Sequence, residues 1–392
     1  MHSLVIRNLR GYAALDMQFT PGPQLIWGPN AAGKTTLLEA VVLLGLGKSH
    51  RTTTDSELIR WGADFLRVEG MVGHAGDAAS VASDVALEVS FQAAGRKRIQ
   101  VNGVPRRPAV LAEHLRIVLF APEEMLLVVG PPALRRAALD TLTAPHDRSY
   151  ASNLATYGRA LQQRNSLLRA IREGGAERDE LRLWDEPFLA AGSAIVAARL
   201  RLLDVLAEPL AAAHREIAPV EERLTVDYAS NAAPFPGEEP RESLARRLHE
   251  TSDKEMWNGS TLVGPHRDDM VFSIGGRDLS TFASRGQQRT AILALKLAEL
   301  DLLTELDGKP PLLLLDDVFS ELDPARRDHL VRRIAELPQA LITTTDPDDM
   351  DADLRRQARQ WRVIPGEAPA GEAPAGEAPA GETGARVVEG GK

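Results

Sequence analysis

Cysteine does not occur anywhere in the 392 residues of the sequence. Its absence excludes disulfide bonds, thiol nucleophiles and cysteine-ligated metals, and it fits a cytoplasmic protein. No run of about 18 apolar residues occurs, so we expect no transmembrane helix; the richest apolar stretch is only Val41–Leu46. The first residues lack a basic head, an apolar core and a cleavage site, so we expect no signal peptide. We therefore expect a cytoplasmic protein that does not contact membranes.

The formal net charge is −9, which argues against a protein whose whole surface binds nucleic acid. The charge is unevenly distributed, however. Residues 366–392 hold five glutamates against one arginine and one lysine, whereas residues 148–172 hold five arginines and no acidic residue. A DNA-binding role has to depend on such local patches, and Arg159, Arg164 and Arg169 are candidate contacts. The alternative is a merely soluble helix, because these arginines do not form one stripe on a helical projection.

Short apolar segments that alternate with turns predict strands at 3–6, 24–27, 85–91, 98–101 and 116–120. The dipeptide Asn102-Gly103 suits a tight hairpin, because both central positions of a type I′ turn need positive φ. From about residue 131 the composition shifts to Ala, Leu, Arg and Glu. Helical periodicity predicts two long helices, over 149–172 and about 177–216, separated by Gly174-Gly175. We expect this pair to form a helical hairpin or arm.

After about residue 261 strands and helices alternate again. The expected strands are 270–274, 312–315 and 340–344, and the expected helices are 286–306 and 324–337. Continuous apolar strands bounded by helices indicate a sheet buried on both faces. Residues 366–380 are Gly-Glu-Ala-Pro-Ala repeated three times, which predicts a disordered tail.

Together these patterns predict an α/β fold of mixed sheets with flanking helices. We expect residues 1–130 to form the first part of an α/β lobe and residues 131–260 to form a helical arm lobe. Residues 261–365 would complete the α/β lobe, and residues 366–392 would be the tail.

The segment Gly28-Pro29-Asn30-Ala31-Ala32-Gly33-Lys34-Thr35 matches the P-loop pattern between an expected strand and an expected helix. Its backbone N–H groups and the helix N-terminus would hold phosphate. Lys34 would bridge the β- and γ-phosphates of ATP, and Thr35 would ligate Mg²⁺. The candidate nucleotide-binding residues here are Gly28, Pro29, Asn30, Ala31, Ala32, Gly33, Lys34, Thr35 and Thr36.

The apolar strand at 312–315 ends in two carboxylates, Asp316 and Asp317. The carboxyl edge of a buried strand is where open α/β folds bind ligands. We expect Asp316 to hold Mg²⁺ and Asp317 to polarise the attacking water. Asp317 stands where ABC ATPases usually carry glutamate, so it reaches through a water or hydrolysis is slow. Lys34, Asp316 and Asp317 are the candidate catalytic residues.

A third motif, Phe282-Ala283-Ser284-Arg285-Gly286-Gln287-Gln288, lies between the P-loop and the acidic strand end. It resembles the ABC signature, with Ser284, Gly286 and Gln287 in matching places. A glycine-permissive turn at a helix N-terminus points N–H groups at phosphate. In ABC proteins this turn meets the ATP of the other subunit, so the motif implies a homodimer that clamps two ATP molecules.

Two further segments fit the same scheme. Ser320-Glu321-Leu322-Asp323 takes the place of the D-loop of ABC heads, which suggests a role at the subunit interface. Asp323 equally suits a helix N-cap before Pro324, and the two roles are compatible. Thr343-Thr344-Thr345-Asp346 stands where many ABC ATPases carry a switch histidine. The missing histidine lowers the expected turnover, and a threonine there could contact the γ-phosphate. Residues 261–269 contain one histidine and two adjacent aspartates, and we favour a structural hairpin or a DNA contact over a metal site there.

These strings, together with Lys-Ser-His-Arg-Thr at 48–52, resemble the RecF family of SMC- and ABC-related ATPases over nearly all of residues 1–365. The most specific strings are Gly-Pro-His-Arg-Asp-Asp at 264–269 and Ser-Arg-Gly-Gln-Gln-Arg-Thr at 284–290. The resemblance implies an ATPase head without a long coiled coil that dimerises on ATP and binds gapped DNA, with weak DNA-stimulated hydrolysis. It also implies recombinase loading with RecR and RecO in repair, replication restart and the SOS response. Arg51 would correspond to the arginine that SMC heads place near nucleotide and DNA.

Three alternatives remain at this point. An ABC subunit of a transporter would need a glutamine-bearing coupling loop, and no convincing glutamine occurs at 116–124. A module that binds ATP without appreciable hydrolysis is compatible with Asp317 and with the missing histidine. A small-molecule kinase would share the P-loop but has no use for the signature segment.

Overall fold

The computed structural model describes residues 1–73, 84–93, 95–145, 147–366 and 384–390. The chain divides into two compact units, the first formed by Met1–Glu124 with Lys296–Lys392 and the second by Met125–Leu295. This division differs from the expected boundary at about residue 260, because it groups residues 261–295 with the helical segment. Among the described residues, no helix is both long enough and apolar enough to cross a lipid bilayer.

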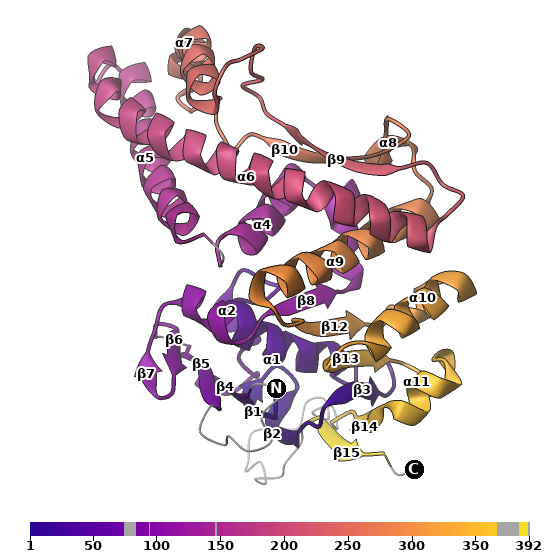
Figure 1. Cartoon of the computed structure of the whole chain (residues 1–392). Helices are drawn as coiled ribbons and strands as arrows, with labels where there is room; N and C mark the ends of the chain where they lie inside the picture. Colours follow the sequence, from indigo (N-terminus) through magenta and orange to yellow (C-terminus); the bar gives the residue numbers. More distant parts are fainter. Residues whose placement is uncertain (74–83, 94, 146, 367–383, 391–392) are drawn as a thin grey trace, which may run out of the picture. The chain divides into compact units, whose positions relative to one another are not determined.

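The first unit contains a six-stranded sheet in the order β15-β14-β3-β13-β12-β8, visible in Figure 1. Its strands are β3 (Gly22–Trp27), β8 (Ile117–Phe120), β12 (Leu312–Asp316), β13 (Gln339–Thr344), β14 (Arg359–Ile364) and β15 (Arg386–Glu389). All neighbours are parallel except β15, which pairs antiparallel with β14. Every residue of β12 and β13 is buried, which confirms the expected doubly covered sheet.

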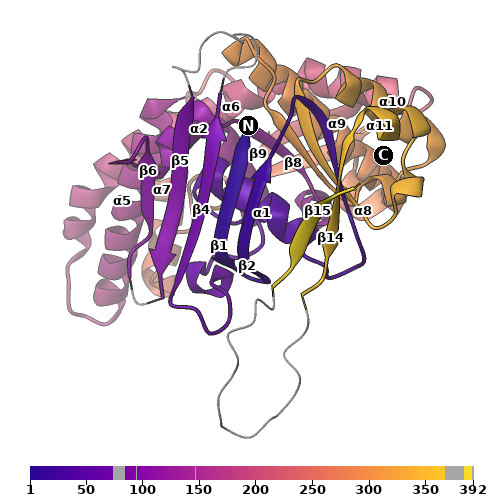
Figure 2. The same ribbon diagram turned by 90° about the horizontal axis from the view of Figure 1, so that it is seen from below.

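A second, antiparallel sheet of the first unit has the order β2-β1-β4-β5-β6-β7, and Figure 2 shows its longer strands side by side. Its strands are β1 (Ser3–Leu9), β2 (Tyr12–Gln18), β4 (Phe65–Val72), β5 (Val85–Gln92), β6 (Arg98–Val101) and β7 (Val104–Pro105). Asn102 and Gly103 join β6 to β7 with φ of 51° and 73°. These two positive values confirm the expected hairpin turn.

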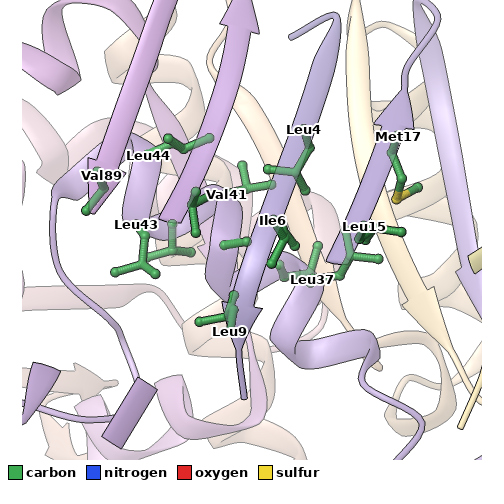
Figure 3. Close-up of a cluster of buried hydrophobic side chains, with 14 of the residues drawn as sticks. Leu4, Ile6, Leu9, Leu15, Met17, Leu37, Val41, Leu43, Leu44 and Val89 are labelled. Carbon is green, nitrogen blue, oxygen red and sulfur yellow. The ribbon is translucent and has the colours of Figure 1, made fainter. Parts of the chain in front are cut away.

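Helix α1 (Lys34–Leu46) carries the core of the first unit. Its residues 36–45 are all buried, and its side chains join one apolar cluster with residues of both sheets. Figure 3 shows Leu37 and Val41 of α1 beside Leu4 and Ile6 of β1. A helix that is apolar on all sides is stable only when it is covered on all sides, and the two sheets cover it.

The remaining helices of the first unit are short. They are η1 (Asp55–Leu58), η3 (Pro108–Val110), α2 (Leu111–His114), η6 (Phe319–Glu321), α10 (Pro324–Ala335), η7 (Pro347–Asp349) and α11 (Ala352–Gln357). The 3-10 turn η4 (Pro122–Met125) crosses into the second unit, and α9 (Arg285–Asp307) begins in the second unit and ends in the first.

The second unit is mainly helical. Its helices are α3 (Leu126–Val129), α4 (Pro132–Thr143), α5 (Arg148–Arg172), η5 (Arg178–Leu181), α6 (Arg182–Ile217), α7 (Pro240–Asn258) and α8 (Leu279–Phe282). A three-stranded sheet completes it with β9 (Leu224–Ala229), β10 (Asp269–Ile274) and β11 (Arg277–Asp278) in the order β11-β10-β9. The expected pair of long helices is present as α5 and α6, which pack along one another (Figure 1). The rings of Tyr157 and Phe188 stack between them at 4.9 Å.

The C-terminal segment differs from the expected tail over 366–392. Residues 386–389 form β15, which pairs with β14 through Val387 opposite Val363. Just before it, the buried Ala385 donates its N–H to the carbonyl of Gly11 at 3.1 Å. The segment after the repeats is therefore part of the fold. Most of the repeats, over residues 367–380, lie outside the described residues.

Candidate functional site: a nucleotide-binding sheet edge and an exposed signature turn

The P-loop connects the end of β3 to the first turn of α1. Ala31 and Gly33 both have positive φ, of 61° and 110°, so the loop winds tightly before the helix begins. A Cβ placed on Gly28 would lie 2.4 Å from the carbonyl oxygen of Val363. This position therefore has no room for a side chain, and the chain can approach β14 only with glycine there.

Lys34 is the first residue of α1, and its side chain folds back over the loop. Its Nζ donates hydrogen bonds to the carbonyls of Gly28 at 2.8 Å and Pro29 at 3.0 Å. Burial lowers the pKa of Lys34, while the charges of Asp317 and Asp316 act in the opposite direction. The lysine charge is thus held between the loop carbonyls and the acids at the end of β12. Thr35 and Thr36 follow it in the first turn of α1.

The acidic pair lies at the same edge of the sheet as the P-loop, because β12 and β3 flank β13 in parallel. Asp316 is buried at the end of β12, and its Oδ1 accepts a 2.6 Å hydrogen bond from Thr343 Oγ1. Asp317 has φ of 52°, in the left-handed region that aspartate tolerates better than most residues. Its N–H donates to Thr343 Oγ1 at 3.0 Å. The structure thus brings Lys34, Asp316 and Asp317 together as expected from the sequence.

Thr343 proves to be a positioning residue. Its side chain is fully buried and bonded to Asp316, and the hydroxyl of Thr344 donates to the carbonyl of Asp346 at 2.9 Å. The sequence analysis placed these threonines at the switch-histidine position and considered a contact with the γ-phosphate. It missed the hydrogen bond between neighbouring strands, which depends on the register of Asp316 opposite Thr343.

The signature turn forms the N-terminus of α9. Ser284 and Gln287 cap it reciprocally: the N–H of Gln287 donates to Ser284 Oγ at 3.2 Å, and the N–H of Ser284 donates to Gln287 Oε1 at 3.0 Å. This is a capping box. It leaves the N–H groups of Arg285 and Gly286, in the first turn, without partners within the helix. Ser284 is exposed, so the turn presents these donors at the surface.

The expected D-loop cap is confirmed. Asp323 accepts a hydrogen bond from the N–H of Arg326 at 3.0 Å, with Pro324 at the first position of α10. Arg327 ties the preceding turn together by donating to the carbonyl of Phe319 at 3.1 Å.

The segment at 261–269 has a structural role. His266 Nδ1 lies 2.6 Å from the hydroxyl of Tyr157, and burial lowers the pKa of His266 to about 4. Asp268 is fully buried and accepts from the hydroxyl of Tyr228 at 2.8 Å, and Asp269 pairs with Arg135 at 2.7 Å. Across the described ranges, no three acidic, histidine or cysteine side chains gather as metal ligands would.

The candidate DNA contacts do not share one environment. Arg164 is buried and pairs with Glu255 at 2.7 Å and Asp185 at 2.8 Å, so assigning it to DNA was wrong. Its partners come from α7 and α6, which the sequence pattern could not place beside it. Arg159 and Arg169 are exposed on α5.

Arg51 lies beside Glu39, a buried acid whose role the sequence analysis missed. Arg51 lies 3.6 Å from Glu39 and 3.9 Å from Glu123. Glu39 is a fully buried acid in the apolar helix α1, where it accepts from Arg10 Nε at 2.6 Å and from Ser49 Oγ at 2.5 Å. A lone acid in an otherwise apolar helix was the available signal. Glu39 fixes the 48–52 segment to the helix that starts at the P-loop.

A P-loop, a strand with an acidic end at the same sheet edge, and a capped glycine turn on a long helix define an ABC-type ATPase head. The model of the RecF/RecN/SMC N-terminal domain matches residues 1–359. Proteins named DNA replication and repair protein RecF from Moorella thermoacetica and Chloroflexus aurantiacus are each 40% identical over 94% of this chain, covering 96% and 98% of their own lengths. The chain belongs to the RecF family.

Solved structures agree. The structure of the recombination mediator protein RecF-ATP in the RecFOR pathway matches with a TM-score of 0.83 at 34% identity, covering 92% of this chain and 94% of that chain. An Smc head domain from Pyrococcus furiosus matches with a TM-score of 0.54 at 14% identity, covering 99% and 95%. The second likeness concerns the fold alone. The expected fold class, an ABC- and SMC-type ATPase head with flanking helices, is confirmed.

Proposed function

We propose that this protein is an ATP-dependent, DNA-binding recombination mediator of DNA repair. The observation that carries the proposal is the shared sheet edge, where the P-loop after β3 and the acidic pair Asp316 and Asp317 at the end of β12 lie on either side of β13. The proposal is supported by relatives named DNA replication and repair protein RecF and by the similar RecF-ATP structure. By the same likeness, RecR and RecO are its protein partners, and it acts in recombinase loading, replication restart and the SOS response.

The donor set at the sheet edge fits ATP with Mg²⁺. The Lys34 ammonium would exchange its hydrogen bonds with the carbonyls of Gly28 and Pro29 for hydrogen bonds with the β- and γ-phosphates of ATP. A carboxylate and a hydroxyl are oxygen ligands of the kind that Mg²⁺ prefers, and Asp316 and Thr35 would supply them. The ion would neutralise charge on the phosphates. Thr343 would keep the Asp316 carboxylate turned toward the site.

Hydrolysis is proposed to be slow. Asp317 would polarise the attacking water, but its side chain is one methylene shorter than the usual glutamate. No histidine follows β13, where the chain continues with Thr345 and Asp346. Thr343 and Thr344 instead bond to Asp316 and Asp346. ATP therefore serves mainly as a ligand that holds a dimeric, DNA-binding state.

The signature turn would complete the ATP site of a second copy. Its free N–H donors and the positive end of the 23-residue helix α9 are suited to a γ-phosphate. The assembly would be a symmetric homodimer with two ATP molecules between the copies.

Sedimentation of the Asp317→Asn variant tests this proposal. The variant keeps every residue proposed to bind ATP, so it should form a dimer that persists in ATP and should bind gapped DNA more tightly with ATP than without. Asp16→Asn, which breaks the exposed pair with Arg7 on the other sheet without touching the sheet edge, is the matched control. If wild type and variant both stay monomeric at saturating ATP, the proposed ATP-bound homodimer is wrong. If neither protein binds DNA, the proposed role as a DNA-binding mediator is wrong.

A further inference from the structure

The β6–β7 hairpin is the most basic short segment of the described first unit. Residues 95–108 carry five basic side chains and no acidic one, in a chain whose formal net charge is −9. They are Arg96, Lys97, Arg98, Arg106 and Arg107. The turn at 102–103 reverses the chain, and the N–H of Arg106 donates to the carbonyl of Ile99 at 2.9 Å. Both basic ends of the hairpin therefore return to the same end of the sheet.

Four of these side chains face solvent. Ile99 and Val101 are buried in the core, so the alternation of a strand places Arg98 on the opposite, outer face. Arg96, Arg98, Arg106 and Arg107 are all exposed. Within the ranges that the structure describes, none of these four arginines has a hydrogen-bonding or ion-pair partner for its side chain.

Other arginines on the outer face of this sheet behave differently. Arg7 of β1 pairs with Asp16 at 2.9 Å, and Arg67 of β4 pairs with Glu88 at 3.1 Å. Their charges are neutralised within the sheet. Positive charge without a local counter-charge is thus concentrated at the β6–β7 edge, on the same unit as the P-loop; Figure 1 labels both strands.

Lys97 anchors this edge to the helix that starts at the P-loop. Its Nζ donates to the carbonyl of Gly47, just past the end of α1, at 2.9 Å and pairs with Asp55 at 2.7 Å. The hairpin base therefore lies against the start of the segment that contains Arg51. The four free arginines extend outward from a fixed point rather than from a loose loop.

We propose that Arg96, Arg98, Arg106 and Arg107 form a binding site for the phosphate backbone of DNA. The guanidinium fork matches phosphate oxygens in a bidentate manner, and four uncompensated charges suit a polyanion. Contacts to phosphates carry no base information, so binding through this site is independent of sequence. The proposal rests on the DNA-binding role proposed above and assigns it a surface.

The same residues have a simpler explanation. Charged side chains and a proline, here Pro105, commonly protect an edge strand such as β7 from pairing with another chain. If protection were their only role, replacing the arginines would promote aggregation and leave DNA affinity unchanged.

The test is the salt dependence of duplex DNA binding by the full chain with ATP. Each phosphate neutralised contributes about −0.9 to the slope of log affinity against log salt. Replacing all four arginines by alanine should make the slope shallower by about 3 to 4 and should weaken binding at low salt at least about tenfold. The paired variants Arg96→Gln with Arg98→Gln, and Arg106→Gln with Arg107→Gln, should each lose about half of that slope.

A matched control removes four exposed arginines that are already ion-paired on the second unit. Alanine at Arg178, Arg182, Arg215 and Arg223 changes the net charge equally and should leave the slope nearly unchanged. Provided that the wild type binds DNA, two results would overturn this site. One is an equal loss of slope in the hairpin variant and in the control variant, and the other is an unchanged slope in the hairpin variants. Wild-type protein that binds no DNA would instead overturn the proposed function. Arginine-dependent binding to phosphatidylserine vesicles with DNA binding intact would reassign the surface to membranes and refute the proposal.

Discussion

Thr343 Oγ1 donates a 2.6 Å hydrogen bond to Asp316 Oδ1 across two parallel strands, and both residues are buried. The same hydroxyl accepts from the N–H of Asp317 at 3.0 Å. One side chain therefore orients the proposed metal ligand and fixes the unusual backbone of its neighbour. Thr343, in the segment expected to stand in place of a switch histidine, thus orients the acidic pair.

We expect Thr343→Val to impair Mg²⁺-dependent hydrolysis while the chain still folds. Valine keeps the shape of threonine but cannot donate to Asp316, and loss of such an outer hydrogen bond typically costs 10- to 100-fold in metal affinity or activity. Titration of Mg²⁺ against ATPase rate measures the effect. Thr344→Val is the control, because that buried hydroxyl bonds to Asp346 instead. Equal effects of the two changes would argue against a specific role of Thr343.

Replacing Lys34 by methionine should weaken ATP binding by at least about tenfold, since charge-assisted hydrogen bonds contribute about 1.5–3 kcal/mol each. In the free protein the lysine bonds only to loop carbonyls, so the fold itself should change little. Calorimetric titration with ATP measures the affinity. Lys309→Met, a change at the surface turn before β12, is the control. An affinity equal to that of wild type would remove the P-loop assignment.

Loss of the buried Glu39 charge should destabilise the first unit. Glu39→Gln leaves Arg10 partly buried without its carboxylate, and breaking such a pair costs about 3 kcal/mol or more. Hydrogen exchange of the α1 amides, which report on this core, measures the cost. Asp16→Asn, which breaks the exposed pair with Arg7, should cost only about 0–1 kcal/mol. If the two variants exchange at the same rate, Glu39 is not a structural anchor.

The second unit should lose stability between about pH 6.5 and pH 4. Burial lowers the folded-state pKa of His266 from 6.5 to about 4, and the charges of Arg267, Arg136 and Arg164 add to this. Between pH 6.5 and pH 4 the His266 imidazole is therefore protonated in the unfolded chain but neutral in the folded one. The free energy of unfolding is highest above pH 6.5 and decreases as the pH falls through this range. At pH 5 the loss is about 2 kcal/mol.

Hydrogen exchange of the α5 amides at pH 7 and pH 5, corrected for the intrinsic rates, measures this loss. His266→Gln, which cannot titrate, should show a smaller pH dependence than wild type. A variant whose pH dependence matches that of wild type would assign the effect to other groups.

Local patterns predicted the elements around the P-loop and the acidic pair. The P-loop and the apolar strand before Asp316 depend on a few consecutive residues, whose backbone preferences and burial are set close by in the chain. The same holds for the Asn102-Gly103 turn and the Asp323 cap. Strand β14 was missed because its mixed polar and apolar residues show no continuous apolar run, and α7 was missed because most of its surface is charged and polar.

The tertiary structure decided which arginines form ion pairs inside the protein and which stay exposed for contact with a partner. Arg164 and Arg159 are similar in the sequence, yet only Arg164 finds Glu255 and Asp185 and becomes buried. The arginines at the β6–β7 edge are free because the sheet turns them outward and places no acid beside them. The ATP-site motifs each consist of a few consecutive residues, so the sequence by itself identified the chemistry of that site. The acids that neutralise an arginine, in contrast, come from distant parts of the chain, and only folding brings them together. Only the folded chain distinguished structural arginines from those exposed for a partner.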